Sequence, residues 1–480
     1  MDRLDGEMEY KPYERCMMCE KKKSSGMQAF LIREPDFYKK ALALIFPVVM
    51  QSIINQGVNM MDTVMVGKLG EVAISASSLA NQFYQIYTFL CMGISAAGLV
   101  LASQYWGANK SEAVKRVFDL CIQLVAAIGV CFAAVSLFIP ERIMGIFIHD
   151  EDVIREGARY LRITAFVFLP HGLSLVITNI IRSVGNAKLG LLTSCLSFLI
   201  NIGANYVFIF GKMGMPELGV MGAAVGTLCA RLVELAICIV YMLWVERTVQ
   251  YRPNALLKLP GTALLKEFRR LGLPAIISDT LLGLAASVMS MILGRMGKEV
   301  VSAYAIVMVF DRMCSVATMG VASAAGVIVG QTVGSGNRER AQKEGETFLI
   351  IGIALGAVAT ALVLVLGTLS VDLYEITQET RKTALLMMDS SAIVVFFQTI
   401  QSTLSKGVLR GGGDTRFLMV ADVIFQWCAS IPLGYIAGVI LKVPPFGVLL
   451  ILRIDYIIKS IWLTFRLKSG RWIHQAKQIT

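Results

Sequence analysis

The sequence is poor in charged residues: Asp, Glu, Lys and Arg make up only 16% of its 480 residues, whereas 56% are apolar. A water-soluble protein needs a more polar surface, so this composition excludes an ordinary soluble globule. The chain has only three histidines and lacks a Cys/His cluster at metal-ligand spacing, a P-loop and a G-x-S-x-G motif. We therefore expect neither an enzyme nor a bound cofactor.

Apolar runs of 18 or more residues recur along the whole chain, and in lipid a spanning segment must satisfy its own backbone hydrogen bonds as a helix. A transmembrane barrel would need shorter segments of alternating polarity, which stretches such as 349–369 lack. The sequence predicts an all-α polytopic membrane protein with twelve transmembrane helices. They are expected at 39–66, 72–105, 112–139, 153–182, 188–211, 219–245, 270–294, 300–333, 343–370, 382–409, 416–440 and 446–466.

An internal repeat runs through these spans at a constant offset of about 227 residues. The matched residues are Pro47 and Pro274, Gly67 and Gly294, Gly70 and Gly297, Ser75 and Ser302, Ala76 and Ala303, Gly93 and Gly320, Gln104 and Gln331, and Gly107 and Gly334. The repeat predicts two pseudo-symmetric six-helix lobes, an architecture typical of transporters that alternate access between two bundles. The expected boundaries are a basic tail (1–37), an N-lobe (38–245), a linker (246–269), a C-lobe (270–468) and a second tail (469–480).

The net charge of +11 is distributed unevenly. Roughly 29 of the lysines and arginines fall in the termini and the even-numbered loops and roughly 9 in the odd-numbered loops, a bias that places both termini in the cytoplasm. We interpret the basic residues as a topological signal in a multi-pass plasma-membrane protein (the inner membrane in a bacterium), with no nucleic-acid partner. We expect no cleaved signal peptide in the basic tail, because it has no short apolar core ahead of the first span, and its Cys16 and Cys19 are too few for a zinc site.

Polar residues form stripes within two of the predicted helices. Gln51, Asn55, Asn59 and Asp62 fall within about 80° of one another on the first helix, as do Ser194, Ser197, Asn201 and Asn205 on the fifth. A carboxylate beside amide and hydroxyl oxygens can bind Na⁺ or take up a proton, and either event changes a buried charge. The alternative is that these groups only hydrogen-bond helices together.

The chain resembles the multidrug and toxic compound extrusion (MATE) transporters over residues 38–468. The resemblance rests on Met61-Asp-Thr-Val-Met-Val-Gly67, Gln104-Tyr-Trp-Gly-Ala108, the segment 201–211, and Gly211-Lys-Met-Gly-Met-Pro-Glu-Leu-Gly219, the last two being most similar to the NorM branch. It implies a cation-coupled antiporter that exports small organic cations. It also implies that Asp62, Asn201, Asn205 and Thr227 form the cation-responsive cluster, with Na⁺ a candidate at Asp62, Asn201 and Asn205.

The predicted C-lobe departs from this pattern. NorM-like members carry a glutamate in helix 7 and an aspartate in helix 10, and the matching residues here are Leu282 and Thr399. Neither residue can ionise, so the sequence does not support coupling through an acid at these positions. Asp279 and Asp311 are candidates for cation contact, and we favour Asp279 for binding a cationic substrate because Asp311 is adjacent to Arg312, whereas Asp279 has no basic neighbour in its own helix. The candidate substrate-binding residues are Gln51, Asn55, Asn59, Asp279, Asp311, Gln398 and Gln401.

Two charged pairs in the spans are expected to be structural. Arg231 and Glu234 are spaced at i and i+3, and Asp455 and Lys459 at i and i+4, so each pair can neutralise itself.

The alternative function is a related flippase for lipid-linked saccharides. Its pyrophosphate substrate would require several arginines that face a central cavity, and the sequence offers Arg159, Arg162, Arg231, Arg312 and Arg453. These lie near helix ends or beside acids, so we favour the antiporter. We expect it to act as a monomer among membrane lipids, and both Na⁺ and H⁺ are candidates for the coupling ion because the same oxygens serve both.

Overall fold

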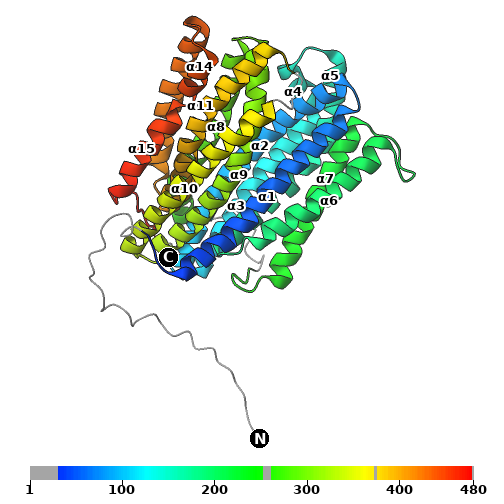
Figure 1. Cartoon of the computed structure of the whole chain (residues 1–480). Helices are drawn as coiled ribbons and strands as arrows, with labels where there is room; N and C mark the ends of the chain where they lie inside the picture. The colour runs from blue at the N-terminus through cyan, green and yellow to red at the C-terminus, as the bar shows by residue number, and fades with distance from the viewer. Residues whose placement is uncertain (1–30, 252–260, 372–375, 478–480) are drawn as a thin grey trace, which may run out of the picture.

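The computed structural model describes residues 31–251, 261–371 and 376–477, and within these ranges every regular element is a helix (Figure 1). The N-terminal half, blue to green in Figure 1, lies beside the C-terminal half, yellow to red. The helices of the N-terminal half are α1 (Pro35–Gly67), α2 (Glu71–Gly107), α3 (Ser111–Phe138), α4 (Pro140–Phe147), α5 (Glu151–Ser183), α6 (Lys188–Phe210) and α7 (Val220–Val240), which continues as the π-helix η2 (Tyr241–Val245).

The C-terminal half repeats this order with more irregular helices. They are α8 (Thr262–Gly294), α9 (Lys298–Gly334), α10 (Arg338–Val371), α11 (Gln378–Ser402) with the π-helix η4 (Thr403–Leu409), α12 (Thr415–Asp422) with η5 (Val423–Ser430), α13 (Ile431–Tyr435) and η6 (Ile436–Ile440), and α14 (Pro445–Leu452) with α15 (Ile454–Lys468).

The predicted all-α membrane fold is confirmed. Eleven helices in the described ranges are long and apolar enough to span a membrane, and the remaining predicted span, 446–466, is built from α14 and α15, which meet at Arg453. Helix α8 begins at Thr262 rather than at 270, so it takes up part of the predicted linker, and the short α4 was not predicted. Cys16, Cys19 and residues 252–260 of the linker lie outside the described residues.

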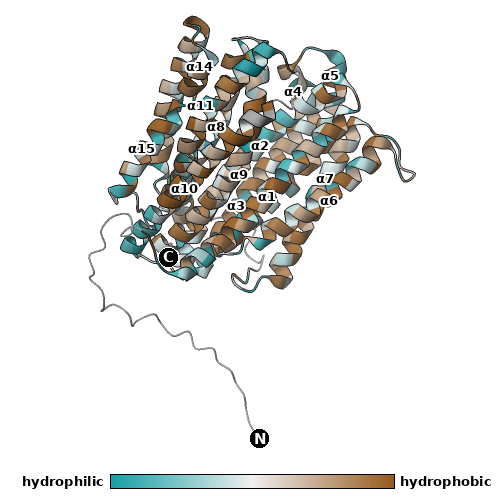
Figure 2. Cartoon of the chain, in the orientation of Figure 1, coloured by the Kyte–Doolittle hydropathy of each residue, from teal (hydrophilic) through white to brown (hydrophobic). Residues whose placement is uncertain are grey.

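The outer surface of the bundle is apolar. In Figure 2, hydrophobic residues cover the long helices, and hydrophilic residues gather toward the two ends of the bundle. Large apolar side chains are exposed, such as Phe138 (83%) and Phe465 (70%). Such a surface suits lipid as the solvent.

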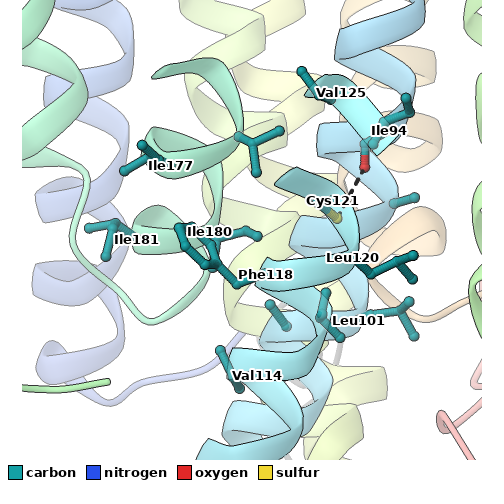
Figure 3. Close-up of a cluster of buried hydrophobic side chains, with 14 of the residues drawn as sticks. Ile94, Leu101, Val114, Phe118, Leu120, Cys121, Val125, Ile177, Ile180 and Ile181 are labelled. Atoms are coloured by element: carbon teal, nitrogen blue, oxygen red, sulfur yellow. Dashed lines mark hydrogen bonds between the residues drawn. The ribbon is translucent and has the colours of Figure 1, made fainter. Parts of the chain in front are cut away.

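The interior of the N-terminal half is packed with aliphatic and aromatic side chains. Figure 3 shows one cluster, in which Ile94 and Leu101 of α2, Phe118 and Cys121 of α3, and Ile180 of α5 lie close together. Cys121 is buried as a free thiol, and its sulfur lies 4.0 Å from the Ile94 carbonyl oxygen. This burial is typical of a cysteine that acts as a small apolar core residue.

The two halves meet through α1, α2, α8 and α9. Their closest contact lies at the end of the bundle where α1 begins and where α2 and α9 end, which we call the base. There Gly107 of α2 faces the Gln331 carbonyl, and Gly334 of α9 faces the Gln104 carbonyl; a Cβ atom would lie 1.8 Å and 1.9 Å from these oxygens. Only glycine permits this approach, and the two contacts are repeat equivalents of each other.

The same two glutamines also hydrogen-bond across the halves. The Gln104 side-chain amide donates to the Gly411 carbonyl (2.9 Å), and that of Gln331 donates to the Ser183 carbonyl (2.8 Å). Gln331 Oε1 accepts a further hydrogen bond from Lys40 Nζ at 2.8 Å. The base is therefore closed by hydrogen bonds that follow the internal repeat.

The described part of the C-terminal segment (469–477) reinforces this closure. Trp472 is fully buried, and its indole N–H donates to Gln342 Oε1 at 2.9 Å. Beyond this anchor, the Ala476 backbone N–H donates to Gln104 Oε1 at 2.7 Å, and the Tyr105 hydroxyl donates to the Lys477 carbonyl at 3.0 Å. The segment thus joins the C-terminal half to α2.

We predict that Gly107→Ala destabilises the base. The added methyl group would overlap the Gln331 carbonyl, so α2 and α9 must separate, at a cost of about 1–3 kcal/mol. The thermal unfolding midpoint of the purified protein should fall. Gly203→Ala in α6, where a Cβ would meet nothing within 4 Å, is the control and should leave the midpoint unchanged or slightly higher. Equal midpoints for Gly107→Ala and wild type would contradict the prediction.

Candidate functional site

The predicted N-lobe cluster is assembled by two helices. The Asn205 side-chain amide, from α6, donates to Asp62 Oδ1 of α1 at 2.5 Å and to Asn201 Oδ1 at 3.3 Å. Asn201 and Asn205 are buried, whereas Asp62 is half-buried. Sequence positions more than 130 residues apart thus meet at one place, with a carboxylate and two amide oxygens close together.

One oxygen of this cluster has no hydrogen-bond donor: Asn205 Oδ1 is buried without a partner among the described residues. It faces Gly226 of α7, where a Cβ would lie only 2.0 Å from it. Thr227 is the next residue of α7 and is half-buried, and no hydrogen bond joins it to Asp62 in the part of the chain that the structure describes. A buried, unsatisfied oxygen beside a carboxylate is chemically suited to a cation or a proton carrier.

The other polar residues of the α1 stripe differ in their surroundings. Gln51 accepts a hydrogen bond from Arg182 of α5 at 2.8 Å, and Arg182 also donates to Ser323 of the other half at 3.4 Å. Asn55 and Asn59 are exposed. The Arg182 side chain thus reaches inward and connects the two halves.

Asp279 has a basic partner that its own helix does not reveal. Arg410, at the end of η4, donates two parallel hydrogen bonds to its carboxylate, each 2.9 Å long. The preference for Asp279 as a cation contact rested on the lack of a basic neighbour in α8. This preference is weakened because Arg410 already neutralises the Asp279 carboxylate. Arg410 precedes three glycines in the sequence; the turn there is made by Gly413, with φ +86°, while Arg410 is buried.

Asp311 is engaged in a similar way. It lies 3.4 Å from Arg453, and it accepts a hydrogen bond from Ser391 at 2.8 Å. On α11, Gln398 has a buried Oε1 without a donor among the described residues, and Gln401 is buried. Of the three candidate acids Asp62, Asp279 and Asp311, only Asp62 has no ion-pair partner among the described residues.

Both predicted structural pairs form. Arg231 lies 2.6 Å from Glu234, and Lys459 lies 2.8 Å from Asp455. Lys459 also contacts Asp422 of α12 at 3.1 Å. Asp422 accepts a hydrogen bond from Ser278 of α8, so one buried lysine holds together three helices of the C-terminal half.

Sequence reasoning missed several of these residues. Gly226 and Asp422 were not singled out, and neither was Lys406, an exposed lysine of η4 that has no hydrogen-bond or ion-pair partner among the described residues. A lysine inside the apolar run 382–409 was itself a detectable signal, because intramembrane charges are rarely accidental. The importance of Gly226 depends on its contact with Asn205, which belongs to another helix, so the sequence around Gly226 gives no signal for it.

Comparisons with known proteins agree with this architecture. The MatE family profile matches the chain twice, over residues 47–207 and 274–436. The chain is 24% identical to a probable multidrug resistance protein NorM of Thermotoga maritima, over 92% of this chain and 94% of that protein. It is 26% identical to a probable multidrug resistance protein NorM of Rhizobium meliloti, over 84% and 88%.

Solved structures share the fold. A multidrug resistance MATE family transporter in an outward-facing conformation superposes with a TM-score of 0.82 at 18% identity, covering 94% of this chain and 99% of that chain. A point mutant of the Vibrio cholerae MATE transporter VcmN superposes with a TM-score of 0.82 at 16% identity, covering 91% and 97%.

We predict that Asp279→Asn destabilises the protein, because it leaves the buried Arg410 guanidinium without its counter-charge. Breaking such a pair from one side typically costs about 3–5 kcal/mol. The double substitution Asp279→Asn/Arg410→Gln removes both charges and should recover part of the lost thermal stability. Asp36→Asn, at an exposed pair with Lys39, is the control and should have almost no effect. A double variant no more stable than Asp279→Asn alone would show that the pair does not neutralise itself as described.

Proposed function

This chain belongs to the MatE family of multidrug and toxic compound extrusion transporters, and we propose that it is a secondary active antiporter that exports small organic compounds in exchange for Na⁺ or H⁺. The names of its NorM relatives support multidrug efflux. The family is one of transporters rather than enzymes, and the driving energy would come from an ion gradient across the plasma membrane.

The observation that carries the proposal is the environment of Asp62. Its carboxylate accepts a hydrogen bond from the neutral Asn205 amide, and no basic side chain lies within ion-pair distance of it among the described residues. Arrival of Na⁺ or H⁺ would neutralise that charge, and the partnerless Asn205 Oδ1 is a further oxygen ligand available to Na⁺. A ligand that binds one lobe arrangement better than another shifts the population between them. Asp62, Asn201, Asn205 and Thr227 would thus form the coupling site.

The closed base supports alternating access between the two lobes. If the base faces the cytoplasm, as the distribution of basic residues predicts, this conformation is closed to the inside. The cross-lobe hydrogen bonds of Gln104 and Gln331 would then have to break when the substrate enters from the cytoplasm. Such a rocking motion needs a contact that can form and separate, and hydrogen bonds from two side-chain amides suit this purpose.

Substrate contacts would come from both lobes. Asn55 and Asn59 offer exposed amides on the face of Asp62, and Gln398 offers a buried oxygen without a donor among the described residues. Acceptor oxygens of this kind suit an organic cation with an ammonium group. Gln51, Gln401, Asp279 and Asp311 would then line or support the substrate path, the two acids acting through their arginine partners.

The flippase alternative is disfavoured by the arginines. Of the five that could meet a pyrophosphate, Arg159, Arg162, Arg231 and Arg453 are paired with Glu156, Glu141, Glu234 and Asp311. Only Arg312 has no ion-pair partner among the described residues. One free arginine among these five is a poor match for a doubly charged pyrophosphate.

We predict that Asp62→Asn abolishes gradient-driven efflux while the protein still inserts and binds substrate, because asparagine cannot carry the switching charge. Efflux of a fluorescent cationic dye from proteoliposomes, driven in turn by a Na⁺ gradient and by a pH gradient, measures this. Asp62→Glu should retain partial activity, and Asn205→Asp should alter the pH dependence of transport. Wild-type rates for Asp62→Asn under both gradients would place the coupling site elsewhere, and loss of dye binding would make its role structural.

The proposed orientation has its own test, in which single residues are labelled from one side of the membrane. Met213, 88% exposed in the loop after α6, lies at the end opposite the base, and Ser335 lies in the exposed turn after α9 at the base. In intact cells a membrane-impermeant maleimide should label Met213→Cys above the background of the unsubstituted protein. Ser335→Cys should be labelled only after the membrane is permeabilised. The reverse pattern would invert the topology.

A further inference from the structure

A basic cavity opens at the base, away from the N-lobe cluster. It has a volume of about 770 Å³ and lies between the first turns of α8, the start of α12 and the C-terminal segment. Lys266 and Arg269 of α8, Arg416 of α12 and Lys477 of the C-terminal segment all contribute to its lining. Three separate stretches of the chain therefore bring positive charge to one place.

Most of this charge is not neutralised. Glu267, the acid in the lining, is used by its neighbours: Arg270 lies 2.6 Å from it, and the Lys477 backbone N–H donates to it at 3.1 Å. Lys266, Arg269, Arg416 and Lys477 have no carboxylate within ion-pair distance among the described residues. After Arg270 and Glu267 cancel, four cations remain around the cavity.

The wall of the cavity also has an apolar side. Leu265 and Leu273 line it and are exposed by 38% and 49%, while the nearby Phe268 and Leu271 turn into the protein core. Leu265 and Leu273 are eight residues apart, so they lie on one side of α8 about two turns apart. This side runs from the charged start of α8 toward the membrane-spanning part of the helix.

We propose that this cavity binds an anionic phospholipid of the surrounding bilayer. The phosphate lies among Lys266, Arg269, Arg416 and Lys477, where charge-assisted hydrogen bonds hold it, and an acyl chain follows Leu265 and Leu273. Basic pockets between transmembrane helices at the cytoplasmic surface are suited to anionic headgroups. A soluble anion would bind the same basic side chains but would make no apolar contact with the two leucines. A lipid therefore fits the cavity better.

The position of Lys477 links this site to closure of the base. The Lys477 carbonyl accepts the hydrogen bond from Tyr105 of α2, and its backbone N–H donates to Glu267 of α8. A headgroup that binds the Lys477 ammonium holds the C-terminal segment in the place where it joins the two halves. The lipid therefore stabilises the conformation with the closed base.

The test is a thermal unfolding series on the full chain purified in detergent. Phosphatidylglycerol should raise the unfolding midpoint of the wild-type protein, whereas phosphatidylcholine should not. In Lys266→Gln/Arg416→Gln the rise should shrink to less than half of the wild-type rise. The matched control is Lys343→Gln/Arg338→Gln, one lysine and one arginine that are exposed at the start of α10 outside the cavity, and it should keep the full rise.

Further arms separate a lipid from a soluble anion. Leu273→Gln should weaken the response to phosphatidylglycerol, because the acyl chain loses its apolar wall. Inorganic phosphate and glycerol phosphate should give no comparable rise in wild type; if either reproduces it, the cavity is a site for a soluble anion and the lipid assignment is wrong. An undiminished rise in Lys266→Gln/Arg416→Gln would overturn the site itself. Neither result depends on transport activity, so the proposed antiport is tested separately.

Discussion

A charged side chain inside a membrane must be neutralised within the protein, because the bilayer interior offers no water to solvate it. The C-terminal half meets this constraint with pairs that cross between helices. Arg410 at the end of η4 binds Asp279 of α8, and Lys459 of α15 binds both its own Asp455 and Asp422 of α12. Each ion pair stabilises one arrangement of the helices that it joins, so we expect the C-terminal half to move as a unit.

The N-terminal half treats its central acid differently. Asp62 accepts a hydrogen bond from the neutral Asn205 amide and has no cation within ion-pair distance, and Asn205 Oδ1 has no donor among the described residues. The acids of the two halves thus differ: Asp279 and Asp311 are paired with arginines, whereas Asp62 has no ion-pair partner among the described residues. The antiport proposal depends on this difference rather than on the shared fold.

The fold was largely predictable, because apolar runs and the 227-residue repeat are local or periodic signals. The meeting of Asp62 with Asn205 was anticipated from the family resemblance and from stripes on two helices. The partner of Asp279 was not, because Arg410 is contributed by a different helix and its position beside three glycines resembles a surface turn. Pairings between helices depend on tertiary packing, which the pattern of a single helix does not encode. The docking of the C-terminal segment onto α2 was missed for the same reason. It depends on backbone hydrogen bonds, which any residue type can form.

The reciprocal glycine contact at the base has a consequence for the origin of the chain. Gly107 packs on the carbonyl of Gln331, and Gly334 on that of Gln104, which is the pattern of an isologous interface, in which the same patch is used on both sides of a two-fold axis. An interface of this kind can be formed by two identical chains. A half-length ancestor carrying one glutamine, one glycine and one acceptor carbonyl could have closed its base as a homodimer. Gene duplication and fusion would then have freed each half to acquire its own charges.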